Sequence, residues 1–350
     1  MRRLVCLSVS LSLALVGCST TPSSDTAPAS ENRAVVLVTG GALVTPFTTP
    51  TAACKDGDGF LAAGNTYTAL RKFLLAQGKQ VYTAPAMDNW GPVQEPSPDS
   101  LGPFTDCPPQ LPESMTILTT GDLNAGGERL ARFINYLHAE YGVTDVDLVG
   151  HSNGGLWSRA AIKVLKDTNA PVTIRSLTTL ATPHAGAIPP RFYAGEIDLA
   201  SCMGQAFCEK AVQRWKDLVA SLDKGLSAQD TVKFLSGAGG WNAAQGNALD
   251  GIPVTLLAGT YFEATGGDPT LWPNDGPISR YSALASDVPD SVMPLRNCWQ
   301  APLLHWNGSS VEVGVPLTRS LTDNPEALAR VNQAIDESDT ASERLNRQGC

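Results

Sequence analysis

Residues 146–155 read Val-Asp-Leu-Val-Gly-His-Ser-Asn-Gly-Gly, and the segment from 150 to 154 follows the pattern Gly-x-Ser-x-Gly. The apolar run before this pattern is typical of a buried strand, and residues 154–165 carry apolar side chains at helical spacing. A serine on a sharp strand-to-helix turn has an exposed hydroxyl, and glycines two residues before and after it allow the turn to close. The following helix directs its N-terminal amides toward any oxyanion that forms on the serine. The stretch therefore predicts that Ser152 is the nucleophile of an acyl hydrolase.

The rest of the chain alternates short apolar runs with helical segments. We predict strands at residues 34–39, 79–83, 172–180 and 254–258, and helices at residues 61–76, 124–141 and 325–346. This alternation predicts an α/β fold with a mostly parallel, doubly wound sheet and helices on both faces. The catalytic domain is expected to span residues 34–350. Residues 187–250 interrupt the alternation with helical and glycine-rich sequence, which favours a cap inserted over the site.

A catalytic serine needs a base, and the base needs a group that orients it. Where this serine turn tops a parallel sheet, the acid and then the histidine follow the serine along the chain. The sequence has four histidines, and His305 alone lies far enough beyond Ser152. The acid is expected on a loop after the strand at 254–258, where Asn-Asp-Gly occupies residues 274–276. We predict Asp275 as the acid, with Asp268 and Asp287 as alternatives.

The oxyanion of the reaction needs two backbone donors. The amide of Asn153, directly after the nucleophile, is the first candidate. The second is expected in the loop after the first buried strand, which reads Thr-Gly-Gly-Ala at residues 39–42. Glycines there allow the backbone to approach a substrate closely. We predict Gly41, with Ala42 as the alternative.

Three segments together resemble bacterial lipases and esterases of the α/β-hydrolase superfamily. Residues 146–155 look like their nucleophile elbow, residues 181–186 (Ala-Thr-Pro-His-Ala-Gly) resemble their T-P-H-x-G segment, and residues 274–276 resemble the N-D-G that carries their acid. The resemblance implies an α/β-hydrolase fold, a lipase-type activity, and supporting rather than basic roles for His151 and His184. Thr39 stands where these lipases usually have a histidine, which leaves the second oxyanion donor open.

The N-terminal segment has the features of a targeting sequence. Arg2 and Arg3 precede an apolar segment at residues 4–16 that is too short to span a membrane. Residues 15–18, Leu-Val-Gly-Cys, resemble the lipobox of bacterial lipoprotein signal peptides. This resemblance implies that residues 1–17 are a signal peptide and that Cys18 is lipidated. The alternative is an ordinary secretory signal with an incidental cysteine.

Residues 18–33 are rich in Ser, Thr, Pro and Ala, which is typical of a flexible tether. The protein is therefore expected to be exported to the cell envelope and held on the membrane by its lipid anchor. The formal net charge of −9 disfavours binding to nucleic acid. The expected partners are an acyl-ester or lipid substrate and the membrane, and the sequence makes no prediction of oligomeric state.

Six cysteines remain once Cys6 is removed and Cys18 is lipidated. An even number of cysteines in an exported protein indicates disulfides. We predict sequential pairing, which gives Cys54–Cys107, Cys202–Cys208 and Cys298–Cys350. The sequence has no Cys-x-x-Cys spacing between these residues and few histidines, so neither a metal site nor a cofactor is predicted.

The pattern favours a serine carboxylic-ester hydrolase, a lipase or esterase that forms an acyl-enzyme on Ser152. An envelope acyltransferase or thioesterase would use the same three side chains with a different acceptor or acyl donor. A non-catalytic binding lipoprotein is the third hypothesis, because a fold alone does not determine function. The length of the acyl chain that the site accepts depends on the shape of the cap. Five tryptophans are candidates for the pocket wall, although each is also compatible with an ordinary core or rim position: Trp90, Trp157, Trp241, Trp272 and Trp306.

Overall fold

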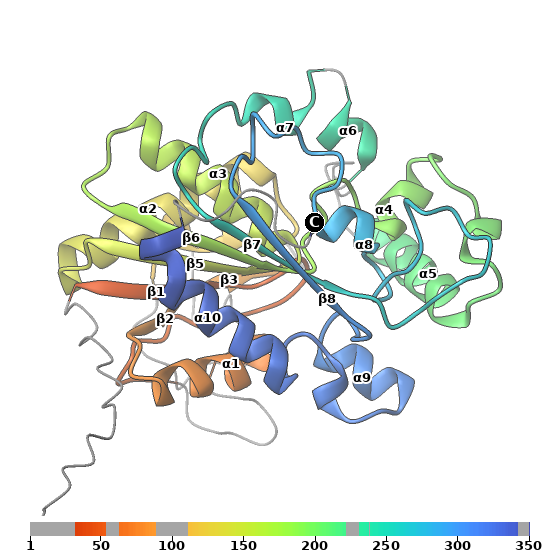
Figure 1. The fold of residues 1–350 in the computed structure, drawn as a ribbon, viewed down its shortest axis with the longest axis horizontal. Coiled ribbons are helices and arrows are strands. Elements are labelled where there is room, and N and C mark those ends of the chain that lie inside the picture. The colour runs from red at the N-terminus through yellow and green to blue at the C-terminus, as the bar shows by residue number, and fades with distance from the viewer. Residues whose placement is uncertain (1–31, 54–62, 89–110, 222–230, 238, 342–349) are drawn as a thin grey trace, which may run out of the picture.

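The computed structural model describes residues 32–53, 63–88, 111–221, 231–237, 239–341 and 350. Its centre is a parallel sheet with the strand order β2-β1-β5-β6-β7-β8 (Figure 1). The strands are β1 (Arg33–Val38), β2 (Val81–Thr83), β5 (Asp145–His151), β6 (Thr173–Leu180), β7 (Val254–Gly259) and β8 (Arg296–Ala301). A second, two-stranded parallel pair consists of β3 (Ala86–Met87) and β4 (Ile117–Leu118).

Helices cover both faces of the sheet (Figure 1). α2 (Leu123–Tyr141) and α3 (Asn153–Asp167) lie on one face, and α1 (Gly64–Ala76) and α10 (Pro325–Ala341) lie on the other. Alternate residues of β1 supply both cores: Val36 and Val38 belong to the cluster under α2 and α3, whereas Val35 and Leu37 belong to the cluster under α1 and α10. Side chains of a strand point to opposite faces in turn, so one apolar run serves two helix layers. The predicted α/β fold class is confirmed.

The remaining helical segments lie between or after the strands, and all of them except α5 are short. They are η2 (Glu113–Met115), α4 (Ile188–Tyr193), η3 (Leu199–Cys202), α5 (Ala206–Ser221), α6 (Val232–Ser236), α7 (Trp241–Ala244), α8 (Arg280–Ala283), α9 (Asn307–Val313) and η5 (Leu317–Arg319). None of the helices in the described part of the chain is long and apolar enough to cross a membrane.

The segment between β6 and β7 divides into two parts. The first part forms a small, separate apolar cluster with Trp272. Its members from this part are Ile188, Cys202, Cys208 and Val212. By contrast, Leu235 and Trp241, from α6 and α7, belong to the large core under α2 and α3. The predicted insertion at residues 187–250 therefore contains a separately packed part at 188–221, which is called the cap below, and a later part that packs on the main domain.

Two of the three predicted disulfides are present in the structure. Cys202 and Cys208 join η3 to the start of α5, and Cys298 joins β8 to the last residue, Cys350. The second bond connects the end of the chain to an edge strand of the sheet. The predicted partners Cys54 and Cys107 lie outside the described residues.

The sequence did not predict β8, which reads Arg-Asn-Cys-Trp-Gln-Ala. This strand is at the edge of the sheet and pairs with β7. An edge strand does not need the continuous apolar run by which β1 and β7 could be identified. The predicted terminal helix begins at Pro325 as expected and is described to Ala341, while residues 342–349 lie outside the described residues.

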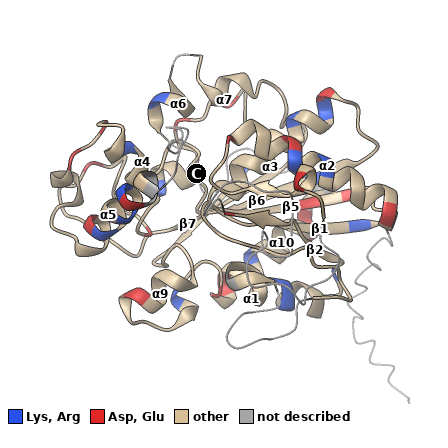
Figure 2. Cartoon of the chain, turned by 180° about the vertical axis from the view of Figure 1, so that it is seen from behind, with Lys and Arg blue, Asp and Glu red and all other residues tan. Residues whose placement is uncertain are grey.

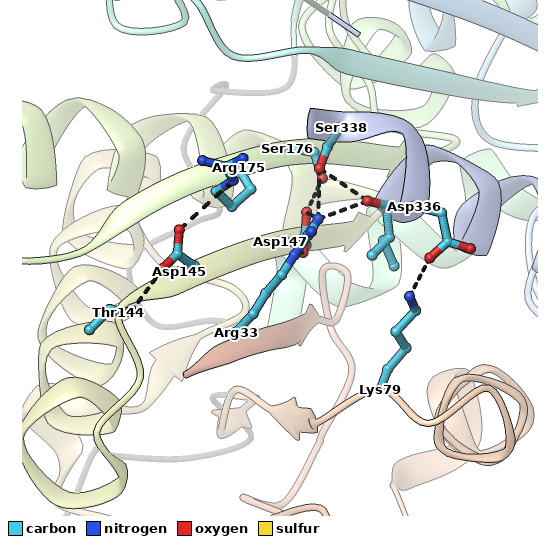
Figure 3. Close-up of polar contacts among 10 residues, drawn as sticks. Arg33, Lys79, Thr144, Asp145, Asp147, Arg175, Ser176, Asp336 and Ser338 are labelled. Carbon is cyan, nitrogen blue, oxygen red and sulfur yellow. Dashed lines mark hydrogen bonds and ion pairs between the residues drawn. The ribbon is translucent and has the colours of Figure 1, made fainter. Parts of the chain in front are cut away.

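A partly buried ion pair joins three strands to the C-terminal helix (Figure 3). Arg33 donates to both carboxylate oxygens of Asp147, at 2.7 and 3.0 Å. The same guanidinium donates to the carbonyl of Ile335 at 2.7 Å and to the hydroxyl of Ser338 at 2.6 Å. Ser176 of β6 donates to Asp147 at 2.6 Å, and the Asp147 side chain is 0% exposed. The network therefore fixes α10 against the amino-terminal part of the sheet, away from the serine turn.

Replacing Arg33 by methionine should lower the free energy of unfolding by about 3 kcal/mol, because the change leaves the buried Asp147 carboxylate without its charge partner. Lys79→Met is the matched control, since it removes the more exposed ion pair with Asp336 on the same helix. An exposed pair of this kind contributes about 1 kcal/mol or less. Urea unfolding of both variants checks the difference. Equal losses for the two would contradict this account of the network.

Candidate active site

Ser152 lies on a sharp turn between β5 and α3, as the sequence predicts. Its backbone has φ 52° and ψ −132°, a region that residues other than glycine rarely adopt. The glycines around it are required by crowding. A Cβ atom at Gly150 would lie 2.5 Å from the amide nitrogen of Gly155, and one at Gly154 would lie 2.1 Å from the carbonyl oxygen of Val38. The turn therefore brings the start of α3 into close contact with β1.

His305 and Asp275 form a buried hydrogen-bonded pair. The loop after β7 carries Asp275, and the loop after β8 carries His305, so both lie at the carboxyl edge of the parallel sheet. The distance from His305 Nδ1 to Asp275 Oδ2 is 2.8 Å. The backbone amide of His305 also donates to the carbonyl of Asp275 at 3.1 Å. Two bonds between the same residues thus fix the imidazole relative to the carboxylate.

The environment of Asp275 affects its charge in two opposite ways. Burial raises the pKa of the carboxyl group, because the charged form loses water. The hydrogen bond from His305 and the amide of Ile278, which donates to Asp275 Oδ1 at 2.9 Å, act in the other direction. A carboxylate that accepts from Nδ1–H leaves Nε2 of His305 as the ring nitrogen that can accept a proton. Asp268, an alternative acid, instead accepts from the amide of Thr270 at 2.8 Å.

Ser152 and His305 line the same pocket. Within the described residues the two side chains do not form a hydrogen bond with each other. Catalytic hydrogen bonds are often long in a free enzyme and shorten when substrate binds. The structure thus brings Ser152, Asp275 and His305 to one edge of the sheet, with the acid and the base in contact and the serine beside them.

His151, the residue before the serine, contacts the base. Its ring lies 4.5 Å from the ring of His305, centroid to centroid, and its Nε2 is 3.1 Å from the carbonyl oxygen of His305. Burial, and secondarily the charge of His305, hold the pKa of His151 well below its ordinary value. A neutral imidazole that donates from Nε2 fits this contact. The side chain of His151 therefore holds the loop that carries His305.

The loop after β1 lies over the serine, as predicted for an oxyanion site. A Cβ atom at Gly40 would lie 2.7 Å from Cβ of Ser152, so only glycine allows this approach. Gly41, Ala42 and Asn153 line the pocket with Ser152. The amide of Ala42 donates to the carbonyl of Thr119 at 3.3 Å. This contact favours Gly41 over Ala42 as the second donor, and Asn153 is the first residue of α3, where amides point out of the helix.

His184, from the T-P-H segment, lies away from the serine in the core. Its Nδ1 is 3.3 Å from the guanidinium of Arg159, and its Nε2 is 3.3 Å from the hydroxyl of Thr179. Burial, followed by the charges of Arg159 and Arg296, holds the pKa of His184 well below its ordinary value. Its backbone carbonyl accepts from the side chain of Asn242 at 2.9 Å. His184 thus connects the end of β6 to α3 and α7.

The pocket above Ser152 has a volume of about 340 Å³, and most of its wall is apolar. One face of α5 contributes Phe207, Ala211, Arg214 and Trp215 to the wall. Of the five candidate tryptophans, Trp306 lines this pocket. Trp157, Trp241 and Trp272 belong to apolar clusters elsewhere, and Trp90 lies outside the described residues.

Sequence reasoning missed Phe207 and Trp215. The spacing of residues 207, 211 and 215 places one side chain per helical turn on one face, so the amphipathic pattern itself was readable. The pattern could not show whether this face covers the site or packs on the main core. Among the described residues, no group of three or more His, Cys, Asp or Glu side chains is arranged to hold a metal ion.

The main sheet is parallel and has helices on both faces. The serine turn follows β5, the third strand of this sheet along the chain, and the acid and the histidine lie on later loops. The chain has the α/β-hydrolase fold. Residues 112–206 match the model of a protein family described as "Putative serine esterase (DUF676)". This match includes Ser152 and its turn and ends at the start of α5.

Two triacylglycerol lipases match a shorter part of the chain. A triacylglycerol lipase of Pseudarthrobacter phenanthrenivorans is 42% identical over 64 residues, which are 18% of this chain and 18% of the relative. A triacylglycerol lipase of Burkholderia plantarii is 42% identical over 64 residues, 18% of this chain and 16% of the relative. The matched region thus spans less than a fifth of the length of these two relatives.

Solved structures resemble the chain over more of its length. A lipase of Bacillus licheniformis in its propeptide form covers 79% of this chain, with 47% of its own chain, at 15% identity and a TM-score of 0.45. An esterase of Pyrococcus furiosus covers 87% of this chain, with 83% of its own chain, at 12% identity and a TM-score of 0.44.

The two buried, neutral histidines predict how stability depends on pH. In the unfolded chain a histidine takes up a proton below about pH 6.5, whereas burial prevents this for His151 and His184 in the folded protein. The free energy of unfolding should therefore fall as the pH falls from about 6.5 to 5, with each histidine contributing up to about 1.4 kcal/mol per pH unit.

His184→Gln should remove one of these two contributions. Urea unfolding at several pH values, compared with the unmodified protein, separates this histidine from carboxyl groups that titrate in the same range. A reduced slope is expected because glutamine has no proton to gain. An unchanged slope would mean that His184 can be protonated inside the folded protein.

Proposed function

We propose that the protein is a serine carboxylic-ester hydrolase of the lipase and esterase type. The observation that carries the proposal is the hydrogen bond of 2.8 Å between His305 and Asp275, in the pocket that Ser152 lines. A serine becomes nucleophilic when a neighbouring base takes its proton, and the base works best when an acid orients it. The family match over residues 112–206 and the lipases that match the chain support the same chemistry.

In the proposed reaction, Ser152 Oγ attacks the carbonyl carbon of the ester while His305 Nε2 takes the hydroxyl proton. The negative charge that develops on the carbonyl oxygen is stabilised by the amides of Gly41 and Asn153. Collapse of the tetrahedral intermediate breaks the bond to the alcohol oxygen, which receives the proton from His305. Water then attacks the acyl-enzyme while His305 takes a proton from the water. Collapse of this second tetrahedral intermediate releases the acid, and His305 returns the proton to Ser152 Oγ.

The pocket supports an apolar acyl group as the substrate. The apolar side chains that line it together with Ser152 are Leu123, Phe207, Trp215, Ile278 and Trp306. Desolvation of apolar atoms by such a wall favours binding by about 25 cal/mol for each Å² of apolar surface that leaves water. The proposed substrates are therefore esters of apolar acids, including lipids.

Ser152→Ala should lower kcat for p-nitrophenyl butyrate by at least about 10⁴-fold, because it removes the nucleophile. Asp275→Asn should lower kcat by about 10³- to 10⁴-fold, because the amide favours the wrong tautomer of His305. Ser286→Ala, a change at a serine outside the pocket, is the control and should retain activity. Steady-state assays of purified variants, with circular dichroism to confirm folding, provide the comparison. Equal activity of Ser152→Ala and the unmodified enzyme would remove the proposal.

We also propose that the protein is exported to the cell envelope and anchored there by a lipid on Cys18. The support is the sequence of residues 1–18, which lie outside the described residues. The predicted tether at residues 18–33 overlaps β1 at Arg33, so the strand begins one residue earlier than expected. A tether that ends before this strand would let the catalytic domain stand away from the membrane.

Cys18→Ala, expressed in a bacterial host with lipoprotein processing, should move the protein from the detergent-soluble membrane fraction into the aqueous fraction. The reason is that a diacylglyceryl group needs this thiol. Cell fractionation and mass spectrometry of the mature N-terminus measure the change. Cys6→Ala, within the predicted signal peptide, is the control. Membrane retention of both variants to the same extent would contradict lipid anchoring at Cys18.

A further inference from the structure

A bidentate ion pair joins two walls of the pocket. Arg214 of α5 donates from Nη1 and Nη2 to the two carboxylate oxygens of Glu312 of α9, at 2.6 and 2.7 Å. Both side chains line the pocket above Ser152. They are 98 residues apart in the sequence, so the contact joins the cap to the segment that follows His305. Figure 2 shows charged segments of both signs on α5 and an acidic segment on α9.

The helix that carries Arg214 is fixed at its first turn. The disulfide Cys202–Cys208 joins this turn to η3. Phe207 stacks on Phe262 with ring centroids 5.2 Å apart, and a Cβ atom at Gly276 would lie 2.4 Å from the Phe207 ring. The first turn of α5 is therefore held beside the loop of Asp275. Arg214 lies about two turns further along the helix, where its contact with Glu312 connects α5 to the opposite wall.

The opposite wall consists of the residues that follow His305. Trp306 follows His305 directly, and α9 then carries Ser309 and Glu312 along the pocket. The Glu312 side chain is 18% exposed and that of Arg214 is 64% exposed, so the pair lies at the outer end of the pocket. Because each charge is neutralised by the other, the pair does not provide a free cation for an anionic substrate. Its geometrical effect is to hold α5 and α9 together.

We propose that the Arg214–Glu312 ion pair determines acyl-chain specificity by keeping the mouth of the pocket narrow. This inference rests on the proposed ester hydrolysis and names its substrate class as esters of short, apolar acyl chains. A volume of about 340 Å³ is at the small end of the range for ligand pockets. A longer acyl chain extends further toward the outer end of the pocket, where the pair lies, so we expect the pair to hinder long chains more than short ones.

The test compares hydrolysis of p-nitrophenyl octanoate and p-nitrophenyl butyrate. Arg214→Met and Glu312→Gln should each raise the octanoate-to-butyrate ratio of kcat/KM by about two- to fivefold, the range expected for loss of a partly exposed pair. The charge exchange Arg214→Glu with Glu312→Arg should return the ratio toward its original value. Salt at 1 M should raise the ratio for the unmodified enzyme but not for the single variants, because it screens the pair.

Lys163→Met is the matched control. It removes the ion pair between Lys163 and Asp167 on α3, which has an N–O distance of 2.7 Å and lies outside the pocket lining. The control should leave the chain-length ratio unchanged. Thermal unfolding of every variant checks that the changes in ratio occur in folded protein.

A binding measurement keeps this inference separate from the proposed function. In a Ser152→Ala background, the binding of methyl octanoate and methyl butyrate can be followed by the change in tryptophan fluorescence, to which Trp215 and Trp306 in the pocket wall contribute. Adding Arg214→Met should strengthen octanoate binding relative to butyrate by the same two- to fivefold factor. Unchanged relative binding and unchanged kinetic ratios would overturn the specificity role, even if ester hydrolysis is established. If relative binding changes but the protein with Ser152 intact has no esterase activity, the result would support the specificity role and contradict the proposed function.

Discussion

Backbone crowding at the serine turn is the constraint on which the rest of the site depends. Ser152 has a positive φ, which costs a residue with a side chain about 1–2 kcal/mol. The surrounding structure holds this conformation, because the amide of Ser152 donates to the carbonyl of Leu180 at 2.8 Å and its carbonyl accepts from Gly155 at 3.1 Å. Without the close approach of Gly154 to β1, α3 could not begin directly after the serine. The exposed hydroxyl and the oriented helix amides both follow from this one turn.

The charges of the site are arranged in a simple way. Burial keeps His151 and His184 neutral, so they form hydrogen bonds that hold neighbouring segments and do not transfer protons. Asp275 is the carboxylate that contacts His305, and the main-chain hydrogen bond from the His305 amide to the Asp275 carbonyl also limits the movement of the imidazole. A base that is held on two sides, by Asp275 and by His151, loses little orientational freedom when substrate binds. The wall around it is mostly apolar, which strengthens electrostatic interactions within the pocket.

The sequence predicted the central sheet except for β8, together with the three proposed catalytic residues, because local signals mark them. The Gly-x-Ser-x-Gly pattern identifies one turn, and the scarcity of histidines left one candidate base. Other features depend on contacts between distant residues. β8 has no apolar run, and the bonds from Arg33 to Asp147 and from Arg214 to Glu312 join positions 114 and 98 residues apart. Periodicity shows that α5 has an apolar face but does not show which surface that face covers.

The central claim is that Ser152 is the activated nucleophile. Its most direct test is reaction of the folded protein with a fluorophosphonate, followed by mass spectrometry of the intact chain and of its peptides. The account predicts one adduct per chain, located on the peptide that contains Ser152, and slow or absent labelling when Asp275 is replaced by asparagine. An unlabelled protein, or an adduct on a different serine with Ser152 unmodified, would contradict it.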